Sequence, residues 1–421
     1  MLDIKFIRNN SDVLKEAARK KQVDIDIDAL IDLDDTRKQK QQLVDSLREE
    51  QNAVSKNVAT ADSQEIRDQL ITEMRGLKED LQKHEAELKE ILQQWKELMM
   101  RVPNVPDMSV PEGGGEEDNV VIKTWGTIPE FDFEPKDHIE LMTNLGMVDF
   151  ERGTKVHGFR GYFLTNEGTE LQWALWNYAR AFFKKKNFNP ITPPTIVRKQ
   201  HLFGTGHLPG DADDIFQTQD DDYLAGTSEI ALMAYHSNEI MKESDLPKRY
   251  LGFSPCYRRE AGSHGADTKG LVRVHEFYKL EQLILCEASH QTSVEFHEEI
   301  NRNFEEFIES LGLPYQQLVL CTGDMKNAQV KSYDIEVWVP SQKSYRELSS
   351  ASYYHDFQTR RFNIRYTDDD GIKRFAHSLN CTAVATPRIL VPLVENNQNA
   401  DGSITIPEVL RPYMDSDRIT N

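Results

Sequence analysis

The stretch CYRREAGSHGADTKGLVRVHEF, residues 256–277, carries four cations between two apolar runs of a chain whose formal net charge is −20. These cations are Arg258, Arg259, Lys269 and Arg273. The flanking runs, YLGFSPCYR (250–258) and LVRVHEFYKLEQLIL (271–285), have the composition of β-strands. The segment between them is longer and more polar than a simple turn needs. We therefore predict a hairpin whose end faces an anion, with Arg258 as its fork-shaped ligand.

Composition is typical of a globular protein of the reducing cytoplasm. The 421 residues are 29% charged and 38% hydrophobic, and this length favours two domains. The first residues, MLDIKFIRNNSD, contain no apolar signal core, and no run approaches the length of a membrane span. The four cysteines, at positions 256, 286, 321 and 381, show no paired spacing, so we expect neither disulfides nor structural zinc. The acidic charge argues against a general nucleic-acid binder such as a DNA-binding protein.

Two heptad registers predict an N-terminal helical hairpin. The first runs from Leu30 to Val58 and the second from Leu70 to Leu98, and the polar turn ATADSQ (59–64) separates them. Neither stretch contains proline. Two such helices, each about 30 residues and so about 45 Å long, are expected to form an antiparallel coiled coil. We assign residues 1–100 to this arm.

Polar residues occupy several positions of the predicted seam. They are Arg37, Lys40, Gln51 and His84. One interpretation is that they fix the register of the two helices at some cost in stability. The other is that Arg37, Lys38, Lys40, Arg48 and Lys56 offer cations to a phosphate backbone. Residues 37–97 contain 11 basic and 13 acidic residues, so the sequence leaves both interpretations open.

A linker and a second domain follow the arm. Residues 101–119, RVPNVPDMSVPEGGGEEDN, are rich in proline, glycine and acidic residues, as linkers are. In residues 120–421, strand-like runs such as SYDIEVWVP (332–340) and FNIRY (362–366) mostly follow one another, with helices expected at 170–186 and 293–312. This order predicts an α+β domain with an antiparallel sheet. The chain contains no P-loop motif, so a nucleotide would need a different cradle.

Three further stretches add chemistry to the hairpin. LAGTSEIAL places Thr227 and Glu229 at a turn with small neighbours, where a ligand can approach. YRELSSASYYHDFQTRR sets Glu347 and Ser350 near the end of a predicted strand, where two oxygens can share a divalent cation. HSLNCTAVATPRIL carries Asn380 and Thr382, and after a break at Pro387 it carries Arg388. Each stretch alone could be an ordinary turn, strand end or capped helix. The occurrence of all of them in this order in one chain is unusual.

With these motifs the chain resembles the bacterial-type seryl-tRNA synthetase family of class II aminoacyl-tRNA synthetases over nearly its whole length. The first class motif corresponds to LQWALWNYARAFFKKKNFNPITPP (171–194), the second to the hairpin from YRRE to RVHEF (257–277), and the third to TPRILVPLVE (386–395). The TSE turn (227–229) and the segment GTGHLPG (204–210) separate this family from its prolyl, threonyl and histidyl relatives.

The resemblance implies an antiparallel-sheet class II catalytic domain and a set of site residues. It implies that ATP binds bent over the sheet together with Mg²⁺, that Arg258 holds the α-phosphate and the serine carboxylate, and that Arg388 meets the γ-phosphate. The implied catalytic residues are Arg258, Glu260 and Arg388. The implied ATP-binding residues are Arg258, Arg259, Glu260, Phe277, Glu347, Leu348, Ser349, Ser350 and Arg388, with Phe277 stacking the adenine and Glu347 and Ser350 holding the metal. The implied serine-binding residues are Thr227, Ser228, Glu229, Arg258, Glu281, Asn380 and Thr382.

The resemblance also implies partners. It implies a cytoplasmic homodimer that uses ATP and L-serine and charges tRNA(Ser), and in addition tRNA(Sec). Two other functions fit the sequence less well. A catalytically silent binding protein is disfavoured because Arg258, Glu260, Arg388, Glu229 and Glu281 are all present. A relative that loads a carrier protein is disfavoured because such proteins lack a long arm.

Overall fold

The computed structural model describes residues 1–262 and 269–420 and divides into two compact units, Met1–Val105 and Pro106–Asn421. Residues 263–268, half of the loop expected inside the opening hairpin, therefore lie outside the described residues. None of the helices in the described part of the chain is both long enough and apolar enough to cross a membrane.

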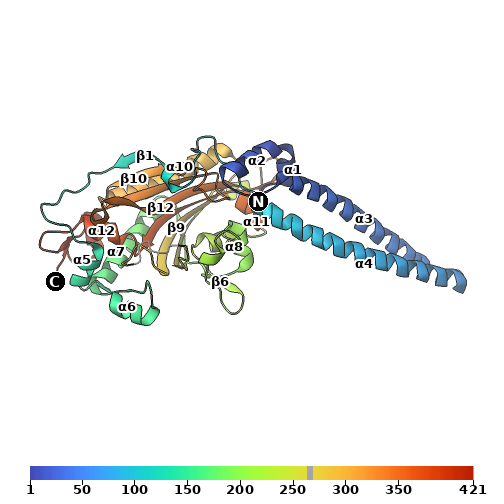
Figure 1. The fold of residues 1–421 in the computed structure, drawn as a ribbon, viewed down its shortest axis with the longest axis horizontal. Coiled ribbons are helices and arrows are strands. Elements are labelled where there is room, and N and C mark those ends of the chain that lie inside the picture. Colours follow the sequence, from blue (N-terminus) through green and yellow to red (C-terminus); the bar gives the residue numbers. More distant parts are fainter. Residues whose placement is uncertain (263–268, 421) are drawn as a thin grey trace. The chain divides into compact units, whose positions relative to one another are not determined.

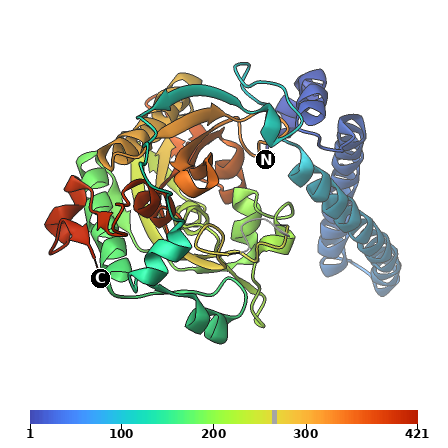
Figure 2. The same ribbon diagram turned by 60° about the vertical axis from the view of Figure 1, so that its left-hand side comes forward.

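The first unit is the predicted helical hairpin with two short helices before it. These helices are α1 Ile4–Asn9, α2 Ser11–Lys20, α3 Ile27–Ala59 and α4 Gln64–Arg101. Figures 1 and 2 show α3 and α4 side by side and antiparallel, joined at their far ends. Each begins where a side chain caps it, since Asp26 accepts from Ala29 N and Ser63 accepts from Ile66 N. The helical arm that the heptads predicted is confirmed.

The polar seam positions bind the two helices to each other. Val44, Leu81 and Leu88 form a small buried cluster. Beside it, Lys40 Nζ lies 2.6 Å from Glu87 Oε2 and 3.2 Å from His84 Nδ1. These contacts favour a register-fixing role for the polar residues.

Other cations of the hairpin also have partners within it. The Arg37 guanidinium lies 5.0 Å from the centre of the Trp95 ring, and Arg48 pairs with Glu85 at 2.7 Å. Lys56, in contrast, is exposed near the tip. A contact of Arg37, Lys40 or Arg48 with phosphate would therefore have to compete with a contact already made inside the arm.

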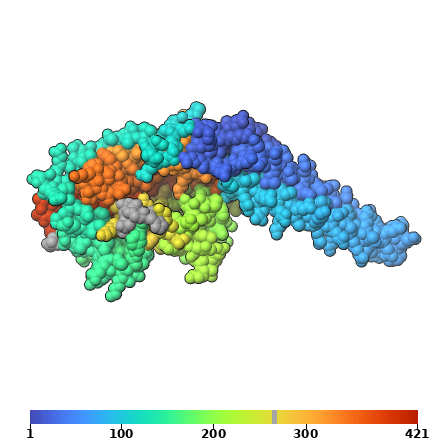
Figure 3. Space-filling view, in the orientation of Figure 1, coloured from blue at the N-terminus to red at the C-terminus, as the bar shows by residue number. Residues whose placement is uncertain are grey.

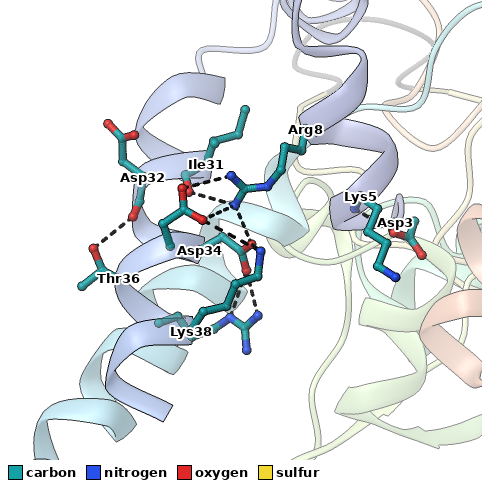
Figure 4. Close-up of polar contacts among 10 residues, drawn as sticks. Asp3, Lys5, Arg8, Ile31, Asp32, Asp34, Thr36 and Lys38 are labelled. Atoms are coloured by element: carbon teal, nitrogen blue, oxygen red, sulfur yellow. Dashed lines mark hydrogen bonds and ion pairs between the residues drawn. The ribbon is translucent and has the colours of Figure 1, made fainter. Parts of the chain in front are cut away.

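A buried carboxylate, Asp34, joins α1 to α3 (Figure 4). Its carboxylate oxygens form ion pairs with Arg8 at 2.8 Å, with Lys38 at 2.7 Å and with Arg37 at 2.8 Å, and its side chain is fully buried. Burial alone would raise the pKa of Asp34, but hydrogen bonds from Lys38, Arg8 and Arg37 outweigh it and lower the pKa to about 2.

We expect Asp34→Asn to destabilise the start of α3. Because the pKa of Asp34 is lower in the folded chain than in the unfolded chain, the ionised carboxylate stabilises the fold above about pH 4 by about 2 kcal/mol, and this contribution disappears as the pH falls through about 2. Hydrogen exchange of the backbone amides of residues 28–40 measures the effect. At pH 7 the variant should exchange about 30-fold faster, and Asp32→Asn serves as a control on the same helix. Equal protection of the two variants at pH 7 would contradict the role of Asp34.

The second unit is built on a sheet of eight strands in the order β1-β10-β11-β12-β15-β9-β8-β4 (Figure 1). The strands are β1 Val120–Trp125, β4 Asn189–Ile191, β8 Lys248–Tyr257, β9 Glu276–Cys286, β10 Tyr315–Val319, β11 Lys331–Val339, β12 Ser344–His355 and β15 His377–Thr386. Every neighbouring pair is antiparallel except β4 and β8. The predicted antiparallel α+β class is confirmed.

Helices α7 Asn166–Lys185 and α10 His290–Ser310 cover one face of this sheet (Figure 2). The remaining helices are α5 His138–Asn144, α6 Phe150–His157, α8 Lys199–Thr205, α9 Glu229–Tyr235, α11 Phe357–Phe362 and α12 Leu390–Asn396. Short strands form small sheets: β2 Val148–Asp149 with β3 Phe163–Leu164, β5 Ile196–Arg198 with β6 Asp222–Leu224, β16 Ile404–Thr405 with β17 Arg418–Ile419, and β7 Ile240–Lys242 with β13 Arg365–Thr367 and β14 Lys373–Phe375.

The main core lies between the sheet and α7 and α10. Alternate residues of β9, Leu280 and Ile284 among them, point into this core. The residues between them, including Lys279 and Glu281, therefore belong to the opposite face. That face carries the candidate site.

Two predicted strands are placed differently in the structure. The return strand of the hairpin was expected from residue 271, but β9 begins at Glu276, and the preceding residues are not in a strand. FNIRY was expected to be a strand, but α11 continues to Phe362 and β13 begins only at Arg365. The cause lies at Asn363, whose left-handed backbone (φ 56°) ends the helix and delays the strand.

The segment predicted as a linker makes contacts with the second unit. Asp107 N donates to Val330 O at 2.9 Å, Thr322 N donates to Pro111 O at 2.9 Å, and Cys321 N donates to Asn119 Oδ1 at 2.9 Å. The second unit accordingly begins at Pro106. We keep as a proposal the division into an arm (residues 1–100), a linker (101–119) and a catalytic domain (120–421).

Candidate active site

The floor of the site is the sheet face opposite the core. Phe277, Lys279 and Glu281 follow one another at every second residue of β9, and the register places Thr382 of β15 opposite Glu281. Thr382 Oγ1 donates to Glu281 Oε2 at 3.5 Å, and Lys279 Nζ lies 2.6 Å from the same oxygen. Both Lys279 and Glu281 are buried. The floor thus presents a buried carboxylate, balanced by one cation, beside a hydroxyl.

The TSE turn enters the site because a glycine lets it approach the sheet. Gly252 of β8 lies opposite Glu281 in the strand register, and Ser228 Oγ donates to Gly252 O at 3.3 Å. A Cβ at Gly252 would lie 2.5 Å from Ser228 Oγ, so a larger residue would push α9 away from the sheet. Thr227 Oγ1 accepts from Glu229 N at 3.3 Å, at the first turn of α9.

Glu229 is a buried carboxyl in a neighbourhood that already holds Glu281. Burial first, and then the charge of Glu281, raise the pKa of Glu229 to about 7. Nearby, Asn380 Oδ1 accepts from the hydroxyl of Tyr354 at 2.9 Å. A cation that enters between Glu229 and Glu281 would relieve their repulsion, and this is the chemistry of an ammonium site.

The cationic end of the hairpin lies just beyond β8. A strand that continued to residue 260 would place Arg258 and Glu260 on one face, but β8 ends at Tyr257 and Glu260 has a left-handed backbone (φ 53°), so strand alternation does not apply. Both side chains nevertheless line the same cavity. The Arg258 guanidinium lies 5.3 Å from the centre of the Phe277 ring, and Glu260 Oε2 accepts from Arg273 at 3.2 Å.

A β-bulge explains how Glu347 and Ser350, three residues apart, reach one face. Along β12, Ser349 pairs with Ile335 and Glu347 pairs with Glu336, so Leu348 is the extra residue. The two residues therefore lie in the interior of a strand rather than at its end as we expected. Together with Asp334 and Glu336 of β11 they line a cavity of about 280 Å³, which we call the acidic cavity.

Arg388 lines the acidic cavity and also a second cavity that it shares with Arg258. It lies between β15 and α12, as the break at Pro387 predicted, and its guanidinium donates to Val272 O at 2.9 Å and to Glu347 O at 3.2 Å. Arg258 and Arg388 line one cavity, which we call the central cavity. Its other walls include Glu260, Phe277, Lys279, Glu347, Leu348 and Thr382. The two arginines that the sequence singled out thus face a shared space.

A third cavity adjoins the central one. It has a volume of about 550 Å³, and its walls include Arg258, Glu260, His207, Asp211 and Lys326. Several of them belong to the segment around α8 and β6, which forms a yellow-green lobe in the space-filling view (Figure 3). GTGHLPG lies in this segment, and its His207 hydrogen-bonds Thr205 Oγ1 at 2.8 Å.

The oxygen ligands expected for Mg²⁺ fit the acidic cavity. Burial, and next the charge of Glu347, raise the pKa of Asp334 well above its ordinary value, and Asp334 Oδ1 is buried with no hydrogen-bond partner among the described residues. A hard divalent cation prefers such oxygens. Within residues 1–262 and 269–420, no group of three or more His, Cys, Asp or Glu side chains is arranged to hold a metal ion by itself. Phosphate oxygens would have to complete the ligand shell.

Two expected ATP-binding residues do not direct their side chains into these cavities. The Ser349 hydroxyl is on the buried side of β12 and donates to Thr382 O at 2.7 Å. Arg259 is exposed, and its main-chain N–H donates to Asp214 O at 2.8 Å. Among the described residues that line the central and third cavities, Arg259 is absent.

The structure brings to the site several residues that were not predicted as site residues from the sequence. They are Lys279, Lys326, Asp334 and Gln358, and Arg273, one of the four cations of the opening stretch, joins them. Strand alternation between Phe277 and Glu281 was a sufficient signal for Lys279. Gln358 had no such signal, because α11 reaches Glu229 only through the fold.

Known proteins that resemble the chain match both of its parts. The family described as "Seryl-tRNA synthetase N-terminal domain" matches residues 1–106, and "tRNA synthetase class II core domain (G, H, P, S and T)" matches residues 215–397. A serine–tRNA ligase from Deinococcus radiodurans is 42% identical over 415 residues, which are 98% of this chain and 97% of that protein. The chain belongs to the seryl-tRNA synthetase family.

Solved structures of the seryl-tRNA synthetase family share the whole fold. The seryl-tRNA synthetase of Pyrococcus horikoshii, complexed with ATP, aligns with a TM-score of 0.89 and 36% identity, covering 100% of this chain and 99% of that one. The cytoplasmic serine–tRNA ligase of Naegleria fowleri, in complex with AMP, aligns with a TM-score of 0.86 and 30% identity over 100% and 99% of the two chains. Membership of the seryl-tRNA synthetase family thus accounts for both the helical arm and the antiparallel sheet.

Proposed function

We propose that this chain activates L-serine with ATP to form seryl-adenylate and pyrophosphate, and then transfers serine to the 3′-terminal adenosine of tRNA(Ser). The observation that supports this proposal is the central cavity, which Arg258, Arg388 and Thr382 line together, with Thr382 donating to the buried Glu281 behind it. An enzyme that joins the α-phosphate of ATP to a small amino acid needs cations for the phosphates and polar groups for the amino acid side by side.

In the first step the serine carboxylate attacks the α-phosphorus and pyrophosphate leaves. Arg258 holds the α-phosphate and the carboxylate, and Arg388 holds the γ-phosphate of a bent triphosphate. Phe277, now in contact with the Arg258 guanidinium, offers its ring to the adenine. Because the nucleophile is already ionised, no general base is needed. Positioning and charge neutralisation supply the rate.

Serine is selected by polar groups that need its ammonium and hydroxyl. Glu229 and Thr227 receive the ammonium, and Glu281, Thr382 and Asn380 receive the hydroxyl. Since Glu281 is buried, a substrate without the hydroxyl leaves it without that partner. A site of this kind rejects the shorter analogue by about 10⁴-fold or more.

Glu347 and Ser350 would hold Mg²⁺, and Asp334 lies in the same cavity. A bound Mg²⁺ would neutralise phosphate charge there. We further propose that Glu260, with its two arginine neighbours Arg273 and Arg160, acts at the nucleotide. Leu348 contributes the apolar wall beside it, and the backbone of residues 348–350 contributes to the same site.

The proposal extends to partners and place. We infer that the arm contacts the shape and backbone of tRNA(Ser), that tRNA(Sec) is a second substrate, and that the enzyme works as a homodimer in the cytoplasm. The family relationship supports these inferences. The intact set of charged site residues opposes a silent binding protein, and the complete helical arm opposes a relative that loads a carrier protein.

Exchange of labelled pyrophosphate into ATP tests the activation step. We expect exchange with serine in the absence of tRNA, and exchange with alanine lower by about 10⁴-fold. Glycine and threonine complete the series. No exchange with serine would leave only a binding protein. Equal exchange with alanine and serine would show that Glu281 does not read the hydroxyl.

A further inference from the structure

Gln358 is a buried residue that hydrogen-bonds the carboxylate of Glu229. It belongs to α11, is 1% exposed, and its Nε2 donates to Glu229 Oε1 at 2.7 Å and to Thr205 O at 3.1 Å. Its Oε1 accepts from the hydroxyl of Ser378 at 2.8 Å. One buried amide therefore joins α8, α9 and β15 at the serine site.

The neighbours of Gln358 determine which way its amide points. The Thr205 carbonyl can only accept a hydrogen bond, so the nitrogen of the amide must face it. The same nitrogen then donates its second hydrogen to Glu229, and the hydroxyl of Ser378 supplies the donor that the amide oxygen needs. Gln358 consequently donates a hydrogen bond to the carboxylate of Glu229, and such a bond favours the ionised form of Glu229.

Glu229 needs this donor because its other surroundings mostly oppose its charge. Glu281 from β9 opposes its charge, whereas Lys279 from β9 and Lys326 from the loop before β11 favour it. The Tyr354 hydroxyl from β12 also lies near and stays neutral, because burial and the charge of Glu229 raise its pKa. Burial and Glu281 raise the pKa of Glu229 and the hydrogen bond from Gln358 lowers it, so that the net pKa is about 7. Without Gln358, Glu229 would be protonated over more of the neutral pH range.

We propose that Gln358 is a positioning residue for serine recognition, which holds Glu229 ionised and aimed at the substrate ammonium and so sets the lowest pH at which serine binds well. The inference rests on the proposed function, because it assumes that Glu229 receives the ammonium. Gln358 touches no substrate atom. Its effect passes through Glu229.

The pH profile of kcat/KM for serine in pyrophosphate exchange tests this inference. In the parent enzyme we expect kcat/KM to fall about tenfold per pH unit below about pH 7. Gln358→Met fills the same space without the donor and should move this acid limb upward by about one pH unit or more. The KM for serine at pH 7 should then rise about fivefold or more and recover toward the parent value at pH 9, with the KM for ATP unchanged.

Two more variants make the test selective. Ser378→Ala leaves Gln358 in place but removes the hydroxyl that holds its oxygen, so a smaller upward shift is expected even if Gln358→Met folds poorly. Gln282→Met is the matched control: Gln282 is also a buried glutamine, but it bonds Ile300 O and Asn303 on the core face of β9. It should leave the acid limb where it is.

The outcomes separate this inference from the proposed function. An upward shift in Gln358→Met and in Ser378→Ala, absent from Gln282→Met, supports it. An unshifted limb, or a rise in the KM for serine that is equal at every pH, overturns it and leaves Gln358 a packing residue. Glu229→Gln should abolish the limb, and if it retains the parent's limb, then Glu229 does not hold the ammonium and that part of the proposed function fails instead.

Discussion

Replacing Arg258 with alanine is expected to reduce serine-dependent pyrophosphate exchange by about 1,000-fold or more. The residue lines both the central and the third cavity, and its guanidinium lies 5.3 Å from the centre of the Phe277 ring. In the proposed function, Arg258 contacts the two reacting groups, the α-phosphate and the serine carboxylate. Removing it should therefore abolish aminoacylation together with exchange.

Two comparisons make the Arg258 result specific. Arg258→Lys keeps the charge but loses the two-pronged geometry, so it should retain a small part of the activity. Arg259→Ala removes an exposed cation one residue away and should lower exchange by less than about threefold. The melting temperature of all three variants should match that of the parent. If Arg258→Ala retains exchange, the phosphate is held elsewhere.

Deleting the hairpin is expected to separate the two activities. The Arg37 guanidinium lies 5.0 Å from the centre of the Trp95 ring, so Thr36 and Leu98 are close enough to join with a short glycine–serine linker in place of residues 37–97. The central cavity belongs entirely to the second unit. Exchange should therefore stay within about threefold of the parent, while charging of tRNA(Ser) falls by about 100-fold or more.

Measuring both activities on one preparation decides the role of the arm. Circular dichroism should show the loss of helix that the deletion removes and no further loss. A replacement of Lys56 by alanine in the intact arm tests an exposed cation near the tip, and only charging should respond. An equal loss of exchange and charging on deletion would mean that the arm is needed for folding or dimerisation rather than for RNA.

The features that could be predicted from the sequence are those that depend on local pattern. The heptads located α3 and α4 because apolar spacing of three and four is a property of the helix itself. Alternation and turn signals identified β8 and β11 as strands of an antiparallel sheet. Arg258, Glu347 and Arg388 were identified because their motifs occur together and in the order of a known family, and the structure brings all three to the central cavity.

The features that could not be predicted depend on exceptions to regular geometry or on distant contacts. The bulge at Leu348 changes the face of every residue beyond it, so Ser349 points away from the site although Ser350 does not. The left-handed backbone of Glu260 similarly ends the alternation after β8. The polar residues of the arm seam were ambiguous because the partner helix, which supplies Glu87 to Lys40, is invisible in a single stretch of sequence.

A crystal structure of the enzyme with a non-hydrolysable ATP analogue, serine and Mg²⁺ tests the central claim most directly. We predict a bent triphosphate, with the α-phosphate and the serine carboxylate on Arg258, the γ-phosphate on Arg388, and the serine hydroxyl within hydrogen-bond distance of Glu281. An extended triphosphate, with Arg388 still donating to the main-chain oxygens of Glu347 and Val272, would contradict the account.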